Sequence, residues 1–386
     1  MNNFEFFNPV KIIFGKDQLK KLSAHIPENK KILMIYGGGS ILKNGVHESI
    51  TNALKNYTLI EFNGIEPNPR YETAMKAVEL IKAEKVDFLL AVGGGSVIDA
   101  TKFIAAAAVF TGEDPWDILT KRRPVKSALP FGAVLTLPAT GSEMNSGSVM
   151  TRESTLEKLA FMSPLTFPQF SFLLPEAAAT LPKHQVANGV VDAFMHTMEQ
   201  YMTYPANAPL QDRFAESILQ TLIEEGPKAY ANPADYDAMS NLMWSATMAL
   251  NGLIGCGVPQ DWAVHMMGHE LTAQFEIDHA RTLAIIAPNH YTYNMESKKE
   301  KLAQYGERVW GITSGTLEEK AHAAIEKTAT FFHSLGVKTK LSEYTDAYSG
   351  TAQNISKRFT DRGWAGLGER QSLKPSDVEK IVEMSY

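Results

Sequence analysis

The sequence predicts an α/β domain with a mostly parallel sheet, followed by an all-helical domain. Two observations support this fold class. In the first half, short apolar runs alternate with helical patterns, as in βαβ units. From about residue 184 onward, apolar residues recur only at helical spacing. A length of 386 residues also exceeds one average domain. We therefore expect domains at 1–183 and 184–386.

The first half contains the expected strands. Residues 10–14, 32–36 and 58–62 are short apolar or β-rich runs bounded by turns, and a buried strand precedes the glycines at 93–95. Helices are expected from near Ile41, over 71–85, and in the segment that carries Asp99 and Lys102. A further apolar run, GAVLTL, leads into a loop of small residues.

Glycine and small hydroxyl residues follow three of these strands. The segments are GGGS at 37–40, GGGS at 93–96 and TLPATGSEMN at 136–145. In a parallel sheet the carboxyl ends of the strands share one edge, where ligands bind. Glycine amides and a helix start suit a phosphate there. One such loop is a common turn, but three together favour a nucleotide diphosphate. The sequence contains neither GxGxxG nor GxxxxGK[ST], so a usual Rossmann signature and a kinase or ATPase are not supported.

The second half predicts successive amphipathic helices. Their expected ranges are 186–203, 208–230, 236–254, 261–274, 280–291, 296–311 and 317–335. The final segment, PSDVEKIVEMSY, predicts a helix capped at Ser376, and residues 340–375 are left without assignment.

Candidate metal ligands cluster within these helices. Asp192 and His196 are four residues apart, as are His265 and His269, and His279 follows ten residues later. A spacing of four places two side chains on one helix face. One carboxylate and several imidazoles suit iron or zinc, although buried hydrogen-bond networks are the alternative for any single histidine. With a nucleotide at the sheet edge, this set predicts a metal-dependent dehydrogenase.

The composition excludes several classes of function. Net charge is −6, so no basic excess indicates nucleic acid or an anionic membrane as partner. The longest apolar run, at 103–110, is too short to span a bilayer, and the amino terminus lacks a signal-peptide pattern. Cys256 is the only cysteine, which excludes an intrachain disulfide and fits a reducing compartment. We expect a cytoplasmic protein with a small-molecule substrate.

Several motifs resemble those of the iron-containing alcohol dehydrogenase family. They are GGGSVIDATK, TLPATGSE, GVVDAFMH and HMMGHELTAQFEIDHARTLAI, and the resemblance extends over nearly the whole chain. The segments YGGGS, VPQDWAVHMMGHELTA and GERVWGI are similar to the branch of butanol dehydrogenases and NADPH-dependent aldehyde reductases. The resemblance implies a dinucleotide-binding α/β domain, a helical metal domain and reversible reduction of aldehydes to primary alcohols. Ala280 replaces a glycine that many relatives carry there.

The resemblance also assigns site residues. It makes Asp192, His196, His265 and His279 the metal ligands, and it leaves His269 beside the metal as a proton relay or an orienting residue. The implied cofactor contacts are Gly94, Gly95 and Ser96 at the pyrophosphate, Asp99 on the nicotinamide side, Thr136, Thr140 and Asn145 along the cleft, Lys158 near the nicotinamide ribose, and Asn68. For Lys158 a solvated surface position is the alternative, and for Asn68 a turn.

Cofactor and metal identity follow from the same residues. An acid near the adenosine ribose favours NAD and would repel the 2′-phosphate of NADP. The loop formed by Gly37, Gly38, Gly39 and Ser40 carries no acid, so NADP(H) is expected over NAD(H). Three imidazoles and one carboxylate accept Fe(II) or Zn(II).

Other functions remain as alternatives. They are a zinc hydrolase, a non-catalytic nucleotide-binding or metal-binding protein, and a polyol or glycerol-type dehydrogenase or dehydroquinate-synthase-like lyase. Apolar residues near the ligands favour aliphatic aldehydes as substrates, and the alternative is that these residues belong to the helix core. The residues are Phe194, Met195, Met198, Trp262, Met266 and Met267. By resemblance, the N-terminal strand is expected to pair across a homodimer.

Overall fold

The chain divides into two compact units. The computed structural model describes residues 1–386. The α/β unit comprises Phe7–Pro182 and Asn232–Asn251, and the helical unit comprises Met1–Phe6, Lys183–Ala231 and Gly252–Tyr386. The sequence predicts two consecutive domains, whereas helix α7 (Tyr236–Ala249) lies within the α/β unit. There, Thr247 of α7 donates a buried hydrogen bond to the Glu143 carboxylate.

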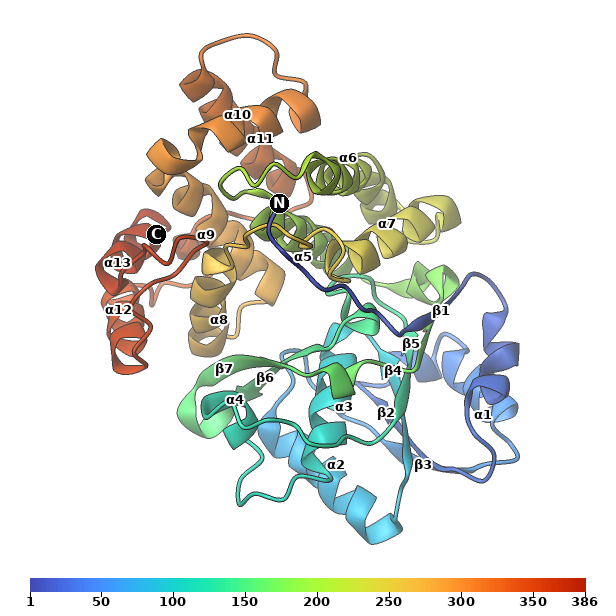
Figure 1. Ribbon diagram of the computed structural model, residues 1–386. Helices are drawn as coiled ribbons and strands as arrows, with labels where there is room; N and C mark the ends of the chain where they lie inside the picture. The colour runs from blue at the N-terminus through green and yellow to red at the C-terminus, as the bar shows by residue number, and fades with distance from the viewer. The chain divides into compact units, whose positions relative to one another are not determined.

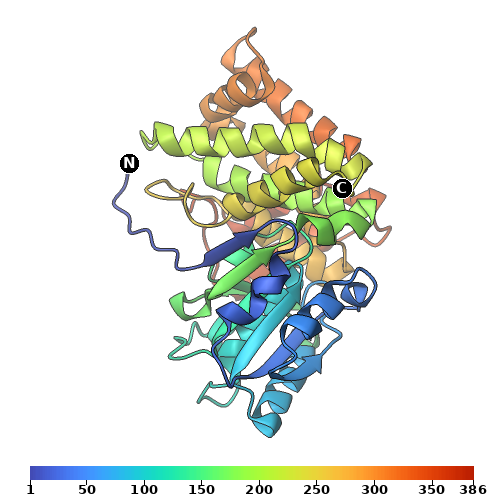
Figure 2. The ribbon, with the colours of Figure 1, turned by 90° about the vertical axis from the view of Figure 1, so that its right-hand side faces the viewer.

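A six-stranded sheet forms the centre of the α/β unit (Figure 1). In spatial order its strands are β1 (Lys11–Phe14), β8 (Phe170–Leu173), β5 (Phe131–Leu135), β4 (Phe88–Gly93), β2 (Lys31–Tyr36) and β3 (Thr58–Phe62). Every neighbouring pair is parallel. The mostly parallel sheet predicted from the sequence is confirmed. β1 forms one edge, beside β8 (Figure 2).

Both faces of this sheet are covered. One face packs with the 3-10 helix η1 (Gln18–His25) and with α1 (Val46–Ala53), where Leu22 and Ile50 are buried against Met34 and Leu90. The opposite face is covered by α3 (Gly95–Ala107), with α2 (Tyr71–Glu84) beside it. The central strands are therefore apolar on both sides, which explains their continuous apolar runs.

Two segments of this unit differ from expectation. The helix expected near Ile41 is only a 3-10 turn, η2 (Ser40–Leu42), because Gly45 at φ 81° interrupts it and α1 begins at Val46. An antiparallel hairpin of β6 (Gly147–Arg152) and β7 (Glu157–Met162) was not expected. It packs on α3.

The helical unit follows the expected helices closely. Its helices are α5 (Lys183–Tyr201), α6 (Pro209–Ala231), α8 (Ala263–Phe275), α9 (His279–Tyr293), α10 (Met295–Trp310), α11 (Leu317–Ser334), α12 (Thr351–Asp361) and α13 (Pro375–Met384). Of these, α12 was not expected. The cap expected at Ser376 is wrong: α13 begins at Pro375, and the Asp377 carboxylate accepts the amide of Lys374. None of the helices has both the length and the apolar character needed to cross a bilayer.

Candidate active site

Helix α5 presents a polar stripe inside an otherwise apolar helix. Asp192, His196 and Glu199 follow one another at spacings of four and three residues, so they lie on one face. All three are buried. The Nδ1 atom of His196 lies 3.8 Å from Oδ1 of Asp192. Buried polar groups require partners, so this stripe marks a site.

The other imidazoles come from α8 and α9. Only three residues separate these helices, and Glu276 at φ 56° ends α8. His279 opens α9, and its Nε2 lies 3.8 Å from Oδ1 of Asp192. The ring centroid of His265 is 4.8 Å from that of His196 and 5.3 Å from that of His279. Three helices thus converge on one point.

The donor set suits a divalent metal. Ligand atoms of Asp192, His265 and His279 all lie within 4.8 Å of one another. Two ligands about 2.0–2.2 Å from one ion can be at most about 4.4 Å apart, so the 3.8 Å separations fit and little closure is needed. Burial lowers the pKa of His196 to about 4, against the opposing charge of Asp192. The ring is therefore neutral, the form in which imidazole binds metal.

Two of the predicted histidines lie outside this triad. His196 adjoins it by stacking on His265, and its buried Nδ1 makes no hydrogen bond. His269, one turn after His265, is buried with its ring centroid 5.0 Å from that of His279 and 6.3 Å from that of His265. His269 therefore lies beside the triad. Whether it relays a proton or orients a neighbour stays a prediction.

Glu199 is a site residue that the sequence analysis missed. Its Oε2 atom lies 3.2 Å from Nδ1 of His265. Burial, reinforced by the charge of Asp261, raises the pKa of Glu199 to about 8. The available signal was its position three residues after His196, which continues the stripe from Asp192.

The α/β unit brings the three small-residue loops together. Strands β5, β4 and β2 are direct neighbours and run parallel, so the segments after Leu135, Gly93 and Tyr36 share one edge. At that edge α3 begins at Gly95, so the amides of Gly95 and Ser96 have no acceptor within the helix. They and the helix dipole suit an anion.

Gly95 has a second, steric requirement. A Cβ atom there would lie 2.4 Å from both Oγ1 and Cγ2 of Thr140. Only glycine allows the loop at 136–145, the third of these loops along the chain, to approach the start of α3 this closely. Thr140 in turn accepts the amide of Ser142 at 3.1 Å. Thr136, also buried, donates its amide to the carbonyl of Gly93.

Behind this edge lies a buried polar network. Lys102 donates to Ser142 Oγ at 2.7 Å, to Asn145 Oδ1 at 2.9 Å and to the carbonyl of Gly147 at 2.7 Å. Asp99 accepts from Ser142 Oγ at 2.5 Å and from the amide of Val149 at 2.9 Å. Burial lowers the pKa of Lys102 to about 8 and raises the pKa of Asp99. Asp99 and Asn145 thus anchor the third loop, and their direct contact with a cofactor stays a prediction.

Lys158 and Asn68 lie together. Lys158 is buried on β7 and donates to Asn68 Oδ1 at 2.8 Å, so it is not a solvated surface lysine. In the 37–40 loop, Gly38 and Ser40 are exposed and Gly39 has φ 90°. Open space surrounds the position of a Cβ on Gly38.

The apolar residues near the ligands divide into two groups. Phe194 is fully buried between the rings of Phe331 and Phe332, 5.5 Å from each centroid, so it belongs to the helix core. Trp262 is half-buried, and its ring lies 5.1 Å from His265 and 6.2 Å from His196. Trp262 is therefore the better candidate to line a substrate site.

Comparison with known families covers both halves of the chain. Residues 9–175 match the family model of iron-containing alcohol dehydrogenases. Residues 186–385 match the C-terminal model of the Fe-containing alcohol dehydrogenase family.

Individual relatives match over their full length. The NADPH-dependent aldehyde reductase YqhD of Escherichia coli is 53% identical, over 99% of each chain. A probable NADH-dependent butanol dehydrogenase of Bacillus subtilis is 42% identical over 100% of each. Among solved structures, E. coli YqhD superimposes with a TM-score of 0.98 at 52% identity, covering 100% of this chain and 99% of that one. The NADH-dependent butanol dehydrogenase A of Thermotoga maritima gives 0.94 at 34% identity, with 100% and 99% covered.

Proposed function

The chain belongs to the iron-containing alcohol dehydrogenase family, and from that premise we propose that it reduces small to medium aliphatic aldehydes to primary alcohols with NADPH at one divalent metal. It is an oxidoreductase of the alcohol dehydrogenase and aldehyde reductase type. A zinc hydrolase, the alternative of another enzyme class, would not account for the glycine loops at 37–40 and 93–96.

The observation that carries this proposal is the convergence of Asp192, His265 and His279 from three helices. These residues would hold the metal, with His196 as the fourth ligand beside them. When bound, a divalent metal polarises the carbonyl of an aldehyde as a Lewis acid, and Fe(II) and Zn(II) both accept this donor set.

The chain's own residues supply the remaining chemistry. Asp192, His196 and His265 are buried, which keeps the dielectric around the donor set low, and the His196 ring is neutral. His269 lies one turn from His265 and would pass a proton to the developing alkoxide or orient its neighbour. Trp262 would present an apolar surface to the substrate chain.

The cofactor would bind at the shared edge of the sheet, where NADPH supplies the hydride. The first turn of α3, at Gly95 and Ser96, would receive the pyrophosphate. Gly94, Thr136 and Thr140 line the same edge, and Asn68, Asp99, Asn145 and Lys158 would support the nicotinamide half. The exposed loop of Gly37, Gly38, Gly39 and Ser40 contains no acid, which favours a 2′-phosphate. The relatives divide on this point, since E. coli YqhD is named NADPH-dependent and the B. subtilis enzyme NADH-dependent.

The test is oxidation of NADPH with butanal. Chelator-stripped enzyme is reconstituted separately with Fe(II), under anaerobic conditions, and with Zn(II), and each preparation is also assayed with NADH. We expect activity that depends on added metal and is higher with NADPH. Full activity after verified removal of metal would refute the metal proposal, and a preference for NADH would refute the cofactor proposal alone.

We also propose that the protein forms a homodimer and resides in the cytoplasm. Strand β1 is an edge strand, and the aromatic residues Phe4, Phe6, Phe7 and Phe14 near it in sequence are exposed. Unpaired strand edges and exposed apolar side chains are typical of association surfaces. Sedimentation equilibrium should give twice the mass of the chain. The single cysteine agrees with a reducing compartment.

A further inference from the structure

We propose that Glu199 is a positioning residue of the metal centre, which orients His265 so that one defined ring nitrogen faces the ion. The inference rests on the proposed metal site. Glu199 touches neither substrate nor cofactor in this proposal, and it acts through His265 alone.

One carboxyl oxygen of Glu199 contacts His265 at two atoms. Oε2 of Glu199 lies 3.2 Å from the backbone nitrogen of His265 and 3.2 Å from its Nδ1. The backbone N–H of His265 can only donate, so Oε2 accepts from it. As a carboxylate Glu199 can only accept, and the ring then donates to Oε2 through Nδ1–H. Nε2 is then the nitrogen that carries the lone pair for a metal. A carboxylate in this position fixes both the tautomer and the ring orientation of a ligand histidine.

Glu199 is itself held in place. Its side chain is 1% exposed, on the same face of α5 as Asp192 and His196. Its backbone carbonyl accepts the amide of Asp261 at 2.9 Å, so α5 binds the segment that leads into α8 at two points. One helix thus sets the position of Asp192 and the orientation of His265 together.

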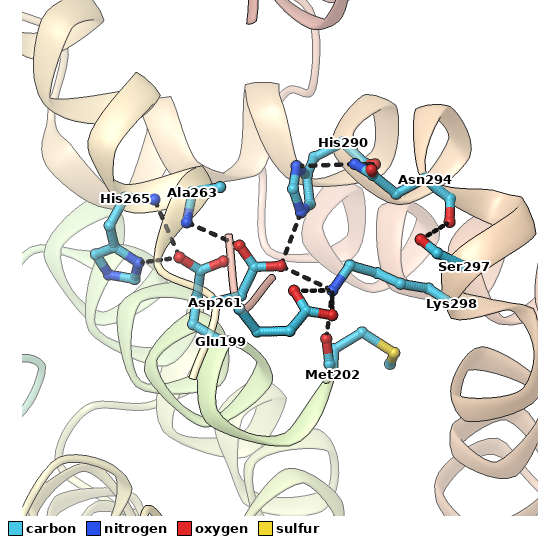
Figure 3. Close-up of polar contacts among 10 residues, drawn as sticks. Glu199, Met202, Asp261, Ala263, His265, His290, Asn294, Ser297 and Lys298 are labelled. Carbon is cyan, nitrogen blue, oxygen red and sulfur yellow. Dashed lines mark hydrogen bonds and ion pairs between the residues drawn. The ribbon is translucent and has the colours of Figure 1, made fainter. Parts of the chain in front are cut away.

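A buried ion network lies next to the contact between Glu199 and His265 (Figure 3). Asp261 accepts the amide of Ala263, the first residue of α8, at 3.0 Å, and its other oxygen lies 2.7 Å from Nζ of Lys298. The same Nζ lies 2.9 Å from Glu369 and donates to the carbonyl of Met202, near the end of α5, at 2.7 Å.

Each polar side chain of this network has a hydrogen-bond or ion-pair partner, and the network fixes the start of α8. His290 adds a fourth side chain, with Nε2 3.3 Å from Oδ2 of Asp261. A buried ion cluster persists only if each charge is compensated, and its geometry is then specific. Between Asp261 and His265, Trp262 adopts φ 65°, a strained conformation for a bulky residue. Residues hold such a conformation only where their surroundings dictate it, as this network does.

The experiment measures metal binding rather than catalysis. Metal-free wild type, Glu199→Gln and Glu199→Asp are titrated with Co(II) against a chromophoric chelator, and the visible spectrum of bound Co(II) reports the ligand geometry. The control is Glu216→Gln, which removes another buried carboxylate that accepts from α5, at Tyr201 Oη, 2.8 Å away, but contacts no ligand histidine.

We expect Glu199→Gln to bind Co(II) about 10–100-fold more weakly, with an altered spectrum, because outer carboxylates contribute affinities of that size. Glu199→Asp keeps the carboxyl group but shortens the reach, so it should give a smaller weakening. Glu216→Gln should change the melting temperature of the metal-free protein without changing affinity or spectrum.

Wild-type affinity and spectrum in folded Glu199→Gln would overturn the inference. If Glu199→Gln does not fold, wild-type binding by Glu199→Asp overturns it as well. Failure of the wild type itself to bind Co(II) would instead refute the proposed function, so the two failures are distinguishable.

Discussion

Each unit of the molecule buries two lysines, and one lysine of each unit differs from the other in the direction of its pKa shift. Lys298, in the helical unit, lies between the carboxylates of Asp261 and Glu369, whose charges outweigh its burial and raise its pKa. Lys102, in the α/β unit, has only neutral acceptors within hydrogen-bond distance, so burial lowers its pKa to about 8.

The difference agrees with the ligand that we propose for each unit. The helical unit buries several carboxylates, including Asp192 and Glu199, and its Lys298 pairs with two others, those of Asp261 and Glu369. Such an environment accepts a dication. The α/β unit offers backbone amides, hydroxyls and a helix start, and its lysine lies behind them. That environment accepts a polyanion through neutral donors.

The largest expected effect is loss of the metal in Asp192→Asn. Removing the only carboxylate of the triad should lower kcat by more than the roughly 100-fold upper limit for residues that merely support ligands. Metal content after gel filtration, measured with kcat, checks this. Asp237→Asn, on the exposed face of α7, is the control. An Asp192→Asn enzyme that keeps its metal and its rate would contradict the assignment.

Next in size is the pH dependence of stability that Lys102 creates. The folded protein releases this proton near pH 8, while the unfolded chain keeps it to 10.5. Between these values the unfolded state binds more protons, so stability should rise with pH. The gain is about 2–3 kcal/mol from pH 7 to 10.

Lys102→Met should remove this rise. Urea unfolding of wild type and variant at pH 7 and 10 measures it, with exposed Lys55→Met as the matched control. Equal slopes for all three proteins would show that Lys102 titrates as an ordinary surface lysine, and the contrast with Lys298 would disappear.

A smaller effect is expected from Gly95→Ala. Its Cβ would clash with Thr140 at 2.4 Å, displacing the third loop and the amides at the start of α3. The KM for NADPH should rise roughly 10–100-fold, or about 1.4–2.7 kcal/mol, while metal content stays constant. Adding Thr140→Gly should recover part of the loss, because it removes the clashing atoms. A Gly95→Ala KM equal to the wild-type value would argue against cofactor binding at this edge.

The smallest effect concerns cofactor choice. Ser40→Asp should lower the ratio of kcat/KM for NADPH to that for NADH roughly tenfold, through repulsion of the 2′-phosphate. The exposed Ser49→Asp places the same charge on α1 and should leave the ratio unchanged. If both variants shift the ratio equally, the effect is one of overall charge rather than of the 37–40 loop.

The sequence predicted what depends on local pattern. Strand β3 lies at 58–62 as expected, and α11 runs over 317–334 against an expectation of 317–335. The three loops meet at one edge because parallel strands require it. The candidate ligands could be proposed because a spacing of four residues pairs Asp192 with His196 and His265 with His269 on one helix face each, with His279 close behind. The family resemblance then left His269 out of the ligand set.

The remainder depends on tertiary partners. The hairpin of β6 and β7 has mixed burial and a turn at Leu156 with φ 50°, so no clean alternation marks it. Nothing within α7 indicates that it packs with the α/β unit through Thr247 and Glu143. Glu199 was missed for the same reason, since its partner His265 lies on another helix.

The pairing of β1 with β8 has a consequence for the order of folding. Lys11 pairs with Phe170, so the first strand to be synthesised cannot pair until β8, the last strand of its sheet, has been made. At typical elongation rates that delay is about 10–30 s. Helix α7, which completes the same unit, emerges later still, after α5 and α6. The nascent chain therefore carries an unpaired apolar strand through much of its synthesis, a period in which holding by a chaperone would protect it from aggregation.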